Sequence, residues 1–167
     1  MYKKSFFIVF EGIEGSGKSY QAKILYKKLR KFIKNVIITR EPGGTKSAEI
    51  IRKIILKDYF EKNKKIKFDK YTDTLLYLAA RNEHLKNKII PALKNKKIII
   101  CDRFTDSTLA YQVYGKKVSL KFINNIHKQI LGKIKPDITF VLKVKKQSFL
   151  RRLKKRKSRN RYDNFPV

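Results

Sequence analysis

Short, almost continuously apolar runs recur along the chain. Four of them occupy residues 5–10, 35–39, 97–101 and 137–142, and each contains β-branched residues. A run of this length without polar alternation is typical of a strand that is buried on both faces. We therefore expect four buried strands.

Segments with helical periodicity lie between these runs. Residues 18–32, 48–56 and 71–93 carry apolar side chains every three or four positions, which is the spacing of an amphipathic helix. Strands that alternate with helices predict parallel β-α-β units, so the expected class is α/β, an open parallel sheet covered by helices on both faces. Ligands of such sheets bind at the carboxyl ends of the strands.

The length and the ends of the chain add further expectations. A chain of 167 residues with 42% hydrophobic content suits one compact domain over residues 1–167. The apolar run before Glu11 is shorter than a signal-peptide core of roughly 7–15 residues or a membrane helix of roughly 20. We therefore expect a cytoplasmic protein without a membrane partner. Cys101 is the single cysteine, which favours a small buried apolar residue over a disulfide or a zinc ligand.

The chain is strongly basic, with 43 Lys+Arg against 13 Asp+Glu and a formal net charge of +30. Such a charge attracts polyanions, nucleotides included. The basic residues are mostly lysines spread from Lys3 to Lys157, and they do not form the aromatic-interleaved stripe of a single-strand binder. A solvated surface explains them, so we expect no specific nucleic-acid partner. A nucleic-acid-binding module without enzymatic activity remains an alternative.

A glycine-rich motif follows the first apolar run and fits GxxxxGK[ST], the pattern of a P-loop, without a mismatch. It comprises Gly12, Ile13, Glu14, Gly15, Ser16, Gly17, Lys18 and Ser19. In this motif backbone N–H groups and a helix N-terminus cradle phosphates, the lysine reaches the β and γ phosphates, and the hydroxyl ligates Mg²⁺. The motif predicts an ATP site, and the alternative is a glycine-rich turn that only begins a helix.

The third apolar run ends in a second candidate site, Asp102 followed by Arg103. If its strand lies next to the P-loop strand, Asp102 can hold Mg²⁺ through water and Arg103 can bind a second anion. An NKxD-type guanine signature is missing from the sequence, which disfavours a GTPase.

Six stretches together resemble the thymidylate kinase family in its bacterial form. They are FEGIEGSGKS, TREPGGT (39–45), LLYLAARNEHL (75–85), DRFTDSTLAYQ (102–112), PDITFVL (136–142) and FLRRLKKRKSRNRYDNF (149–165). The resemblance implies a P-loop nucleoside-monophosphate-kinase fold and transfer of the ATP γ-phosphoryl group to dTMP, which gives dTDP and ADP for dTTP synthesis. It also implies a homodimer, and the segment 71–93 is a candidate for its interface.

The resemblance assigns a base site to the long predicted helix. Arg81 matches the arginine that binds thymine O4, and Tyr77, one turn earlier, matches the aromatic residue that stacks on the base. Because cytosine carries an amine donor in place of O4, an arginine here selects against cytosine. The alternative from spacing alone is a core tyrosine and a solvated arginine.

Further nucleotide contacts are implied by the same resemblance. Ser107 and Thr108 match positions near N3 of the base, Tyr111 matches a tyrosine that disfavours ribonucleotides, and Gln112 completes the motif. Glu14 matches the acid that binds the 3′-hydroxyl of the acceptor.

Arginines are the implied clamps on the acceptor phosphate. Arg40 and Arg103 are the main candidates and Arg52 is a weaker one, whereas 42–44 suit a plain turn as well as a ligand contact. The second pKa of a phosphate monoester is about 6, so the acceptor is already ionised at neutral pH. Catalysis then needs positioning and charge neutralisation instead of a general base. Accordingly, we expect His84 and His127 to be surface residues.

A lid over ATP is predicted at about 149–165. Its arginines Arg156 and Arg161 match the catalytic pair of the bacterial form, with Arg152 one turn earlier. The family's acidic positions in the lid are altered to Asn160 and Asp163, and Lys143 replaces an acid after the fourth run. A basic surface helix is the alternative.

The sequence ends at Val167, earlier than the family pattern, so we expect a C-terminal truncation that leaves a marginally stable and poorly active chain. A deoxynucleoside kinase, with Glu11 as the base, is the alternative enzyme.

Overall fold

A computed structural model describes residues 4–56, 68–145, 147–148 and 151–152. Its sheet contains the strands β1 (Phe6–Glu11), β2 (Val36–Arg40), β3 (Ile98–Asp102) and β4 (Ile138–Val141). The strand order is β2-β3-β1-β4 and all pairs are parallel. The register sets Phe10 opposite Asp102, so the strand that leads into the P-loop and the strand that ends in the acid are neighbours.

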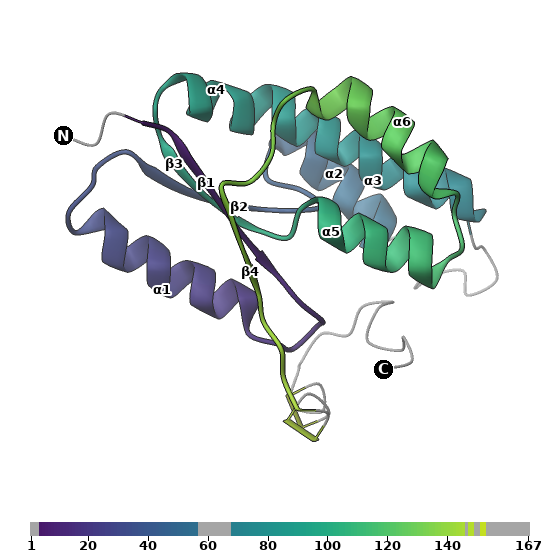
Figure 1. The fold of residues 1–167 in the computed structure, drawn as a ribbon, viewed down its shortest axis with the longest axis horizontal. Helices are drawn as coiled ribbons and strands as arrows, with labels where there is room; N and C mark the ends of the chain where they lie inside the picture. Colours follow the sequence, from purple (N-terminus) through teal and green to yellow (C-terminus); the bar gives the residue numbers. More distant parts are fainter. Residues whose placement is uncertain (1–3, 57–67, 146, 149–150, 153–167) are drawn as a thin grey trace.

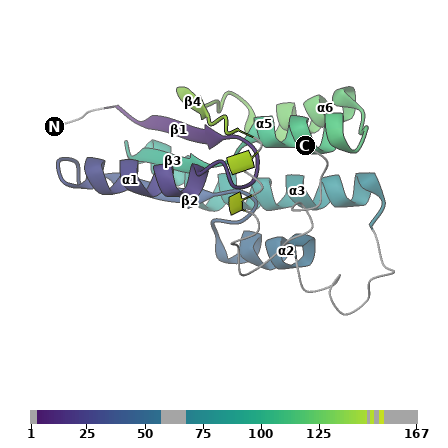
Figure 2. The ribbon, with the colours of Figure 1, turned by 90° about the horizontal axis from the view of Figure 1, so that it is seen from below.

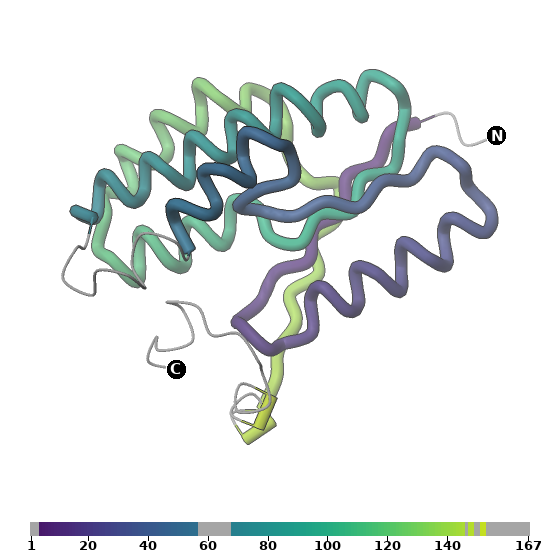
Figure 3. Tube along the Cα trace, turned by 180° about the vertical axis from the view of Figure 1, so that it is seen from behind, coloured from purple at the N-terminus to yellow at the C-terminus, as the bar shows by residue number. Residues whose placement is uncertain are grey.

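Helices cover both faces of this sheet. Alternate residues of the central strands point to opposite sides, and the apolar side chains on each side pack against helices. Ile8 and Phe10 pack with α1 (Lys18–Arg30) on one face, whereas Phe7 and Val9 pack with the helical segment around Leu85 on the other. Figure 3 shows α1 on its own side of the strands, opposite the remaining helices. The α/β fold with two covered faces is therefore confirmed.

The second helical layer is built around α3 (Lys70–His84). Figure 2 shows α3 between α2 (Lys46–Leu56) and α6 (Leu120–Leu131), with α5 (Thr105–Thr108) beside α6. A π-helical segment, η2 (Leu109–Gly115), continues α5. Figure 1 shows α5 following β3 at the carboxyl end of the sheet.

The predicted single helix over 71–93 is divided into three parts. After α3 comes a π-helical turn, η1 (Leu85–Ile89), and then α4 (Ile90–Lys94). Pro91 lies at the beginning of α4. Because proline lacks an N–H group, a regular α-helical hydrogen-bond ladder cannot pass through it.

The expectation of four fully buried strands is wrong for the fourth one. Ile138, Phe140 and Val141 in β4 are 42%, 44% and 62% exposed. β4 is an edge strand that pairs with β1, and within the described part of the chain its side chains remain accessible. By contrast, Cys101 is buried and free, as expected.

None of the helices in the described ranges is long and apolar enough to cross a membrane.

Candidate active site

The P-loop connects β1 to α1 and takes the backbone shape that its glycines predict. Gly12, Gly15 and Gly17 have φ values of 140°, 71° and 98°, a region that L-residues with a Cβ atom rarely adopt. A Cβ atom on Gly12 would also lie 2.5 Å from the carbonyl oxygen of Leu142. Gly17 is the N-cap of α1, so the positive end of that helix faces the loop.

Lys18 lies inside this loop and is only 5% exposed. Its Nζ donates a hydrogen bond of 2.6 Å to the carbonyl oxygen of Ile13. Burial, followed by repulsion from Arg103, lowers the pKa of Lys18 to about 8. A poorly solvated ammonium group at the centre of the loop is a strong attractor for phosphate oxygens.

Ser19 and Asp102 meet at the start of α1. The Ser19 hydroxyl donates to Oδ2 of Asp102, whereas the buried Oδ1 atom has no hydrogen-bond partner among the described residues. Over the same ranges the structure has no cluster of three or more His, Cys, Asp or Glu that could enclose a metal. Two oxygen donors beside a phosphate site suit Mg²⁺, which usually binds through a few protein oxygens, water and substrate phosphates.

One cavity of about 710 Å³ extends from the P-loop to the helical layer. Its lining includes the P-loop residues from Glu14 to Ser19, whereas the predicted Gly12 and Ile13 are not among the described residues that line it. The lining also includes the predicted residues Arg40, Arg52, Tyr77, Arg81, Asp102, Arg103, Ser107, Thr108, Tyr111 and Gln112. The volume is in the range of small-molecule sites, so the structure brings the predicted donor and acceptor residues together.

Arg103 joins the P-loop to α5 in the middle of the cavity. Its guanidinium forms a 2.7 Å ion pair with Glu14 and donates at 2.9 Å to the Ser107 hydroxyl. It also lies 5.3 Å from the centre of the Tyr111 ring. The φ value of Arg103 is +73°, which is uncommon for a residue with a side chain and is typical of functional sites.

Glu11 holds the start of α5 through hydrogen bonds. Its carboxylate accepts hydrogen bonds from the Phe104 N–H at 2.7 Å, the Ser107 N–H at 3.2 Å and the Ser107 hydroxyl at 2.6 Å. Burial raises the pKa of Glu11 despite these bonds. Glu11 is not among the described residues that line the cavity, and this position does not suit a base for an acceptor hydroxyl.

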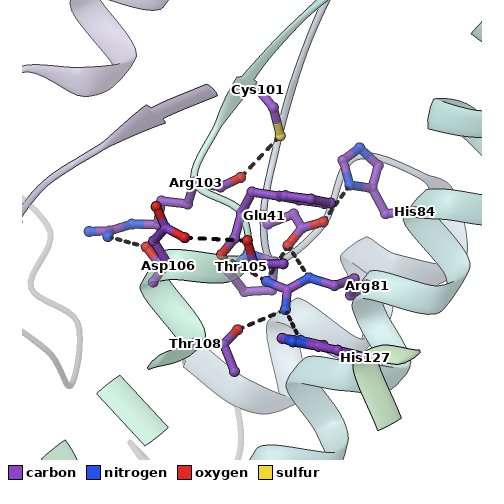
Figure 4. Close-up of polar contacts among 12 residues, drawn as sticks. Glu41, Arg81, His84, Cys101, Arg103, Thr105, Asp106, Thr108 and His127 are labelled. Atoms are coloured by element: carbon purple, nitrogen blue, oxygen red, sulfur yellow. Dashed lines mark hydrogen bonds and ion pairs between the residues drawn. The ribbon is translucent and has the colours of Figure 1, made fainter. Parts of the chain in front are cut away.

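Arg81 is the centre of a buried polar network (Figure 4). Its Nε donates to Glu41 at 2.8 Å and its Nη2 to the Phe104 carbonyl at 2.9 Å. Its Nη1 donates to the Thr108 hydroxyl at 2.8 Å and lies 2.7 Å from Nε2 of His127. At 4% exposure Arg81 is not the solvated arginine of the alternative interpretation.

The prediction that both histidines are surface residues is wrong. His84 is fully buried and His127 is 9% exposed. His84 lies 3.1 Å from Glu41 through Nδ1 and 2.7 Å from the Thr39 hydroxyl through Nε2. Both rings face the network instead of solvent because Glu41, Arg81 and Thr39 supply the partners that a buried imidazole requires.

Glu41 and the two histidines are the residues that sequence reasoning missed. Glu41 stands directly after β2, at a strand end where functional residues gather, so its position was a usable signal. For His127 the sequence contains no comparable signal, because its partner Arg81 is 46 residues away.

Three predicted base and phosphate residues have distinct environments. Arg40 pairs with Glu49 at 3.0 Å on the surface side of the cavity, and Tyr77 is half-buried in its wall. Gln112 is 1% exposed, and its Nε2 has no hydrogen-bond partner within the described ranges. A buried amide donor without a partner at a cavity wall suits a ligand acceptor.

Most of the predicted lid lies outside the described residues. This applies to Arg156 and Arg161 and also to the altered positions Asn160 and Asp163. Arg152 is described, lines the cavity and donates at 2.9 Å to the carbonyl oxygen of Gly15. Lys143 is exposed, and nothing in the structure explains it.

A parallel sheet with a P-loop after one of its inner strands, and an arginine-rich cavity beside that loop, is the arrangement of a P-loop kinase that acts on a small anionic acceptor. Comparison with known proteins specifies the acceptor. The family model for thymidylate kinase matches residues 10–166. This chain therefore belongs to the thymidylate kinase family, the ATP-dependent enzymes that convert dTMP to dTDP.

Individual relatives agree with this assignment. The thymidylate kinase of Wolbachia pipientis subsp. Culex pipiens (strain wPip) is 45% identical over 163 residues, which cover 96% of this chain and 74% of the relative. That of Wolbachia sp. subsp. Brugia malayi (strain TRS) is 46% identical over 164 residues, with 96% and 74% coverage. The crystal structure of thymidylate kinase from Ehrlichia chaffeensis matches with a TM-score of 0.76 and 39% identity, covering 90% of this chain and 82% of that chain.

Proposed function

We propose that ATP places its phosphates on the P-loop and that dTMP occupies the helical end of the same cavity. The observation that supports this arrangement best is the continuity of the 710 Å³ cavity between Lys18 and Arg81. Two polyanions bound at its ends would meet beside Arg103.

At the base end, Tyr77 provides the stacking surface and Arg81 provides the donor for thymine O4. Thr108 lines the cavity and its hydroxyl oxygen accepts a hydrogen bond from Arg81 Nη1, so O4 fits beside that hydroxyl. The partnerless Nε2 of Gln112 suits a carbonyl oxygen of the base. Ser107 also lines the cavity, and its hydroxyl donates a hydrogen bond to Glu11.

At the sugar and phosphate end, Glu14 accepts from the 3′-hydroxyl while Arg103 and Arg40 bind the acceptor phosphate. Tyr111 lies against Arg103, where it would crowd a 2′-hydroxyl. Arg103 and Arg40 are paired with Glu14 and Glu49. Binding of the substrate phosphate would therefore replace protein carboxylates with ligand anions.

In the reaction, a phosphate oxygen of dTMP forms a bond to the γ-phosphorus of ATP while the bond from that phosphorus to the leaving ADP oxygen breaks. Lys18 and Arg103 balance the charge of the transferred group. Ser19 and Asp102 would hold Mg²⁺, which supplies neutralisation of the triphosphate. Arg156 and Arg161, as lid arginines, are proposed to complete the site, and Arg152 already reaches the P-loop.

We also propose a homodimer and a cytoplasmic location. The exposed apolar side chains Ile50 on α2, with 62% exposure, and Leu75 on α3, with 47%, favour an interface on this side of the helical layer. Light scattering after size-exclusion chromatography tests the dimer, and cell fractionation tests the location.

An ADP-release assay with ATP, Mg²⁺ and dTMP, dUMP, dCMP or thymidine tests the function. We expect the highest kcat/KM with dTMP and a loss of at least about a hundredfold in Lys18→Ala, since that lysine acts on the transferred phosphates. Preference for thymidine would support a deoxynucleoside kinase. Salt-sensitive binding to nucleic acid that survives Lys18→Ala, without turnover, would support the nucleic-acid-binding alternative.

A further inference from the structure

We propose that His127 is a positioning residue for Arg81 and that it thereby sets the base selectivity of the enzyme. His127 lies on α6, outside every motif that carries the family resemblance, and it is not among the described residues that line the cavity. It can therefore influence the nucleotide through Arg81. This inference rests on the proposed base-binding role of Arg81.

The Arg81 guanidinium has five N–H bonds that can donate hydrogen bonds. Nε lies 2.8 Å and Nη2 lies 2.7 Å from Oε2 of Glu41, and Nη2 is also 2.9 Å from the Phe104 carbonyl. These contacts hold one edge of the planar group. Nη1 then has two protons, and its two partners are the Thr108 hydroxyl and Nε2 of His127.

The two partners of Nη1 lie on different sides with respect to the cavity. Thr108 lines the cavity and His127 does not. By accepting one Nη1 proton away from the cavity, His127 directs the other proton toward Thr108 and toward a carbonyl oxygen bound beside it. Figure 4 shows the imidazole and the Thr108 hydroxyl at this end of the guanidinium.

This role requires that Nε2 of His127 carries a lone pair, because Arg81 is always a donor. Burial and then the charge of Arg81 lower the pKa of His127 to about 4, although Glu41 acts in the opposite direction. The imidazole is therefore neutral at physiological pH, and its Nδ1 carries the proton. A neutral acceptor can hold the guanidinium without reducing the positive charge that it presents to the base.

Three variants of the full chain test the proposal. His127→Leu removes the acceptor, His127→Gln retains an acceptor at about the position of Nε2, and Asn125→Leu changes an exposed position of the same helix as the control. A hydrogen bond to a charged group changes an equilibrium by about tenfold or more when it is removed.

We expect His127→Leu to raise the KM for dTMP about tenfold and to reduce the dTMP-to-dCMP ratio of kcat/KM by a similar factor. The KM for ATP and the kcat with dTMP should remain within about twofold, and His127→Gln should restore both the KM and the ratio. A purely structural role of His127 would instead lower activity toward all acceptors together and leave the selectivity ratio unchanged. That result, or a His127→Gln variant as impaired as His127→Leu, would overturn the proposal.

A measurement on the wild-type chain tests the tautomer of His127 without relying on the activity of the variants. The protein has two histidines, so the ring-nitrogen NMR signals that disappear in His127→Gln belong to His127. We expect an unprotonated Nε2 and a protonated Nδ1 at pH 7, and a protonated Nε2 would refute the proposal. If the wild-type chain phosphorylates no dTMP, the proposed function fails; if it is selective for dTMP and His127→Leu is equally selective, only the role of His127 fails.

Discussion

Replacing Glu41 with glutamine changes one buried charge at the centre of the Arg81 network. The carboxylate is 6% exposed and accepts from Arg81 at 2.8 and 2.7 Å and from His84 at 3.1 Å. Glu41→Gln keeps the shape of the side chain but leaves the buried guanidinium without its counter-charge. The network loses charge while its packing is retained.

The magnitude follows from the burial of both partners. Removing one member of a buried ion pair typically costs about 3–5 kcal/mol, because the remaining charge stays desolvated. Since glutamine retains one acceptor oxygen, we expect a loss near the lower end, about 3 kcal/mol of the free energy of unfolding. At about 2–4 °C per kcal/mol, the melting temperature should fall by roughly 6–12 °C.

Urea unfolding of the two chains at pH 7 measures this difference, and Glu49→Gln is the matched control. Glu49 also pairs with an arginine, Arg40, but the two side chains are 36% and 53% exposed. A surface pair contributes about 0–1 kcal/mol, so the control should lose much less stability. Equal losses of stability in Glu41→Gln and Glu49→Gln would refute the reasoning that the Glu41–Arg81 pair matters more because it is buried.

The pH dependence provides a second test of Glu41. Burial alone would raise its pKa, but the charge of Arg81 and the His84 hydrogen bond lower it below the usual 4.5. A carboxylate with a lowered pKa contributes its full stability above pH 4.5 and loses it as the pH falls through the folded-state value. The stability difference between wild type and Glu41→Gln should therefore be constant above about pH 5 and shrink below pH 4.5.

Three further predictions concern the loops around the cavity. Gly44→Ala should destabilise the fold by about 2–4 kcal/mol in urea unfolding, because φ is +93° and the new Cβ atom would lie 2.6 Å from His84 Nε2. Gly132→Ala, with φ +56°, ψ −117° and nothing within 4 Å of the new Cβ atom, should cost only the backbone strain of about 1–3 kcal/mol, so the loss in Gly44→Ala should be the larger of the two. Because the lowered pKa of Lys18 is about 8, its charge is present below pH 8 and lost above it. The Kd for ATP should therefore rise from about pH 8 upward by up to tenfold per pH unit. A Kd that does not change with pH would contradict the proposal that the charge of Lys18 attracts the phosphates. Asp102→Asn should raise the Mg²⁺ concentration for half-maximal activity about tenfold, and an unchanged Mg²⁺ titration would exclude Asp102 from the metal site.

Some features of this protein depend on contiguous residues and were predictable from the sequence, whereas others depend on residues that are far apart in the chain and were not. The strand runs and the P-loop are contiguous, so their backbone preferences are local properties of the sequence. Gly12 to Ser19 therefore indicated a phosphate site before any contact was known. The order of the motifs likewise indicated the family, which the comparisons confirmed.

The environment of a polar side chain, however, depends on partners that the fold supplies. His84 and His127 carry no local signal, and they are buried because Arg81 and Glu41 approach them from other elements. β4 has the same composition as a buried strand, yet among the described residues it lies at the edge of the sheet, pairs only with β1 and has exposed side chains. The sequence alone determined the phosphate-binding loop and the fold class, because both follow from short-range backbone preferences and from periodicity. Only the tertiary structure decided which charges are buried, because burial is a property of long-range packing.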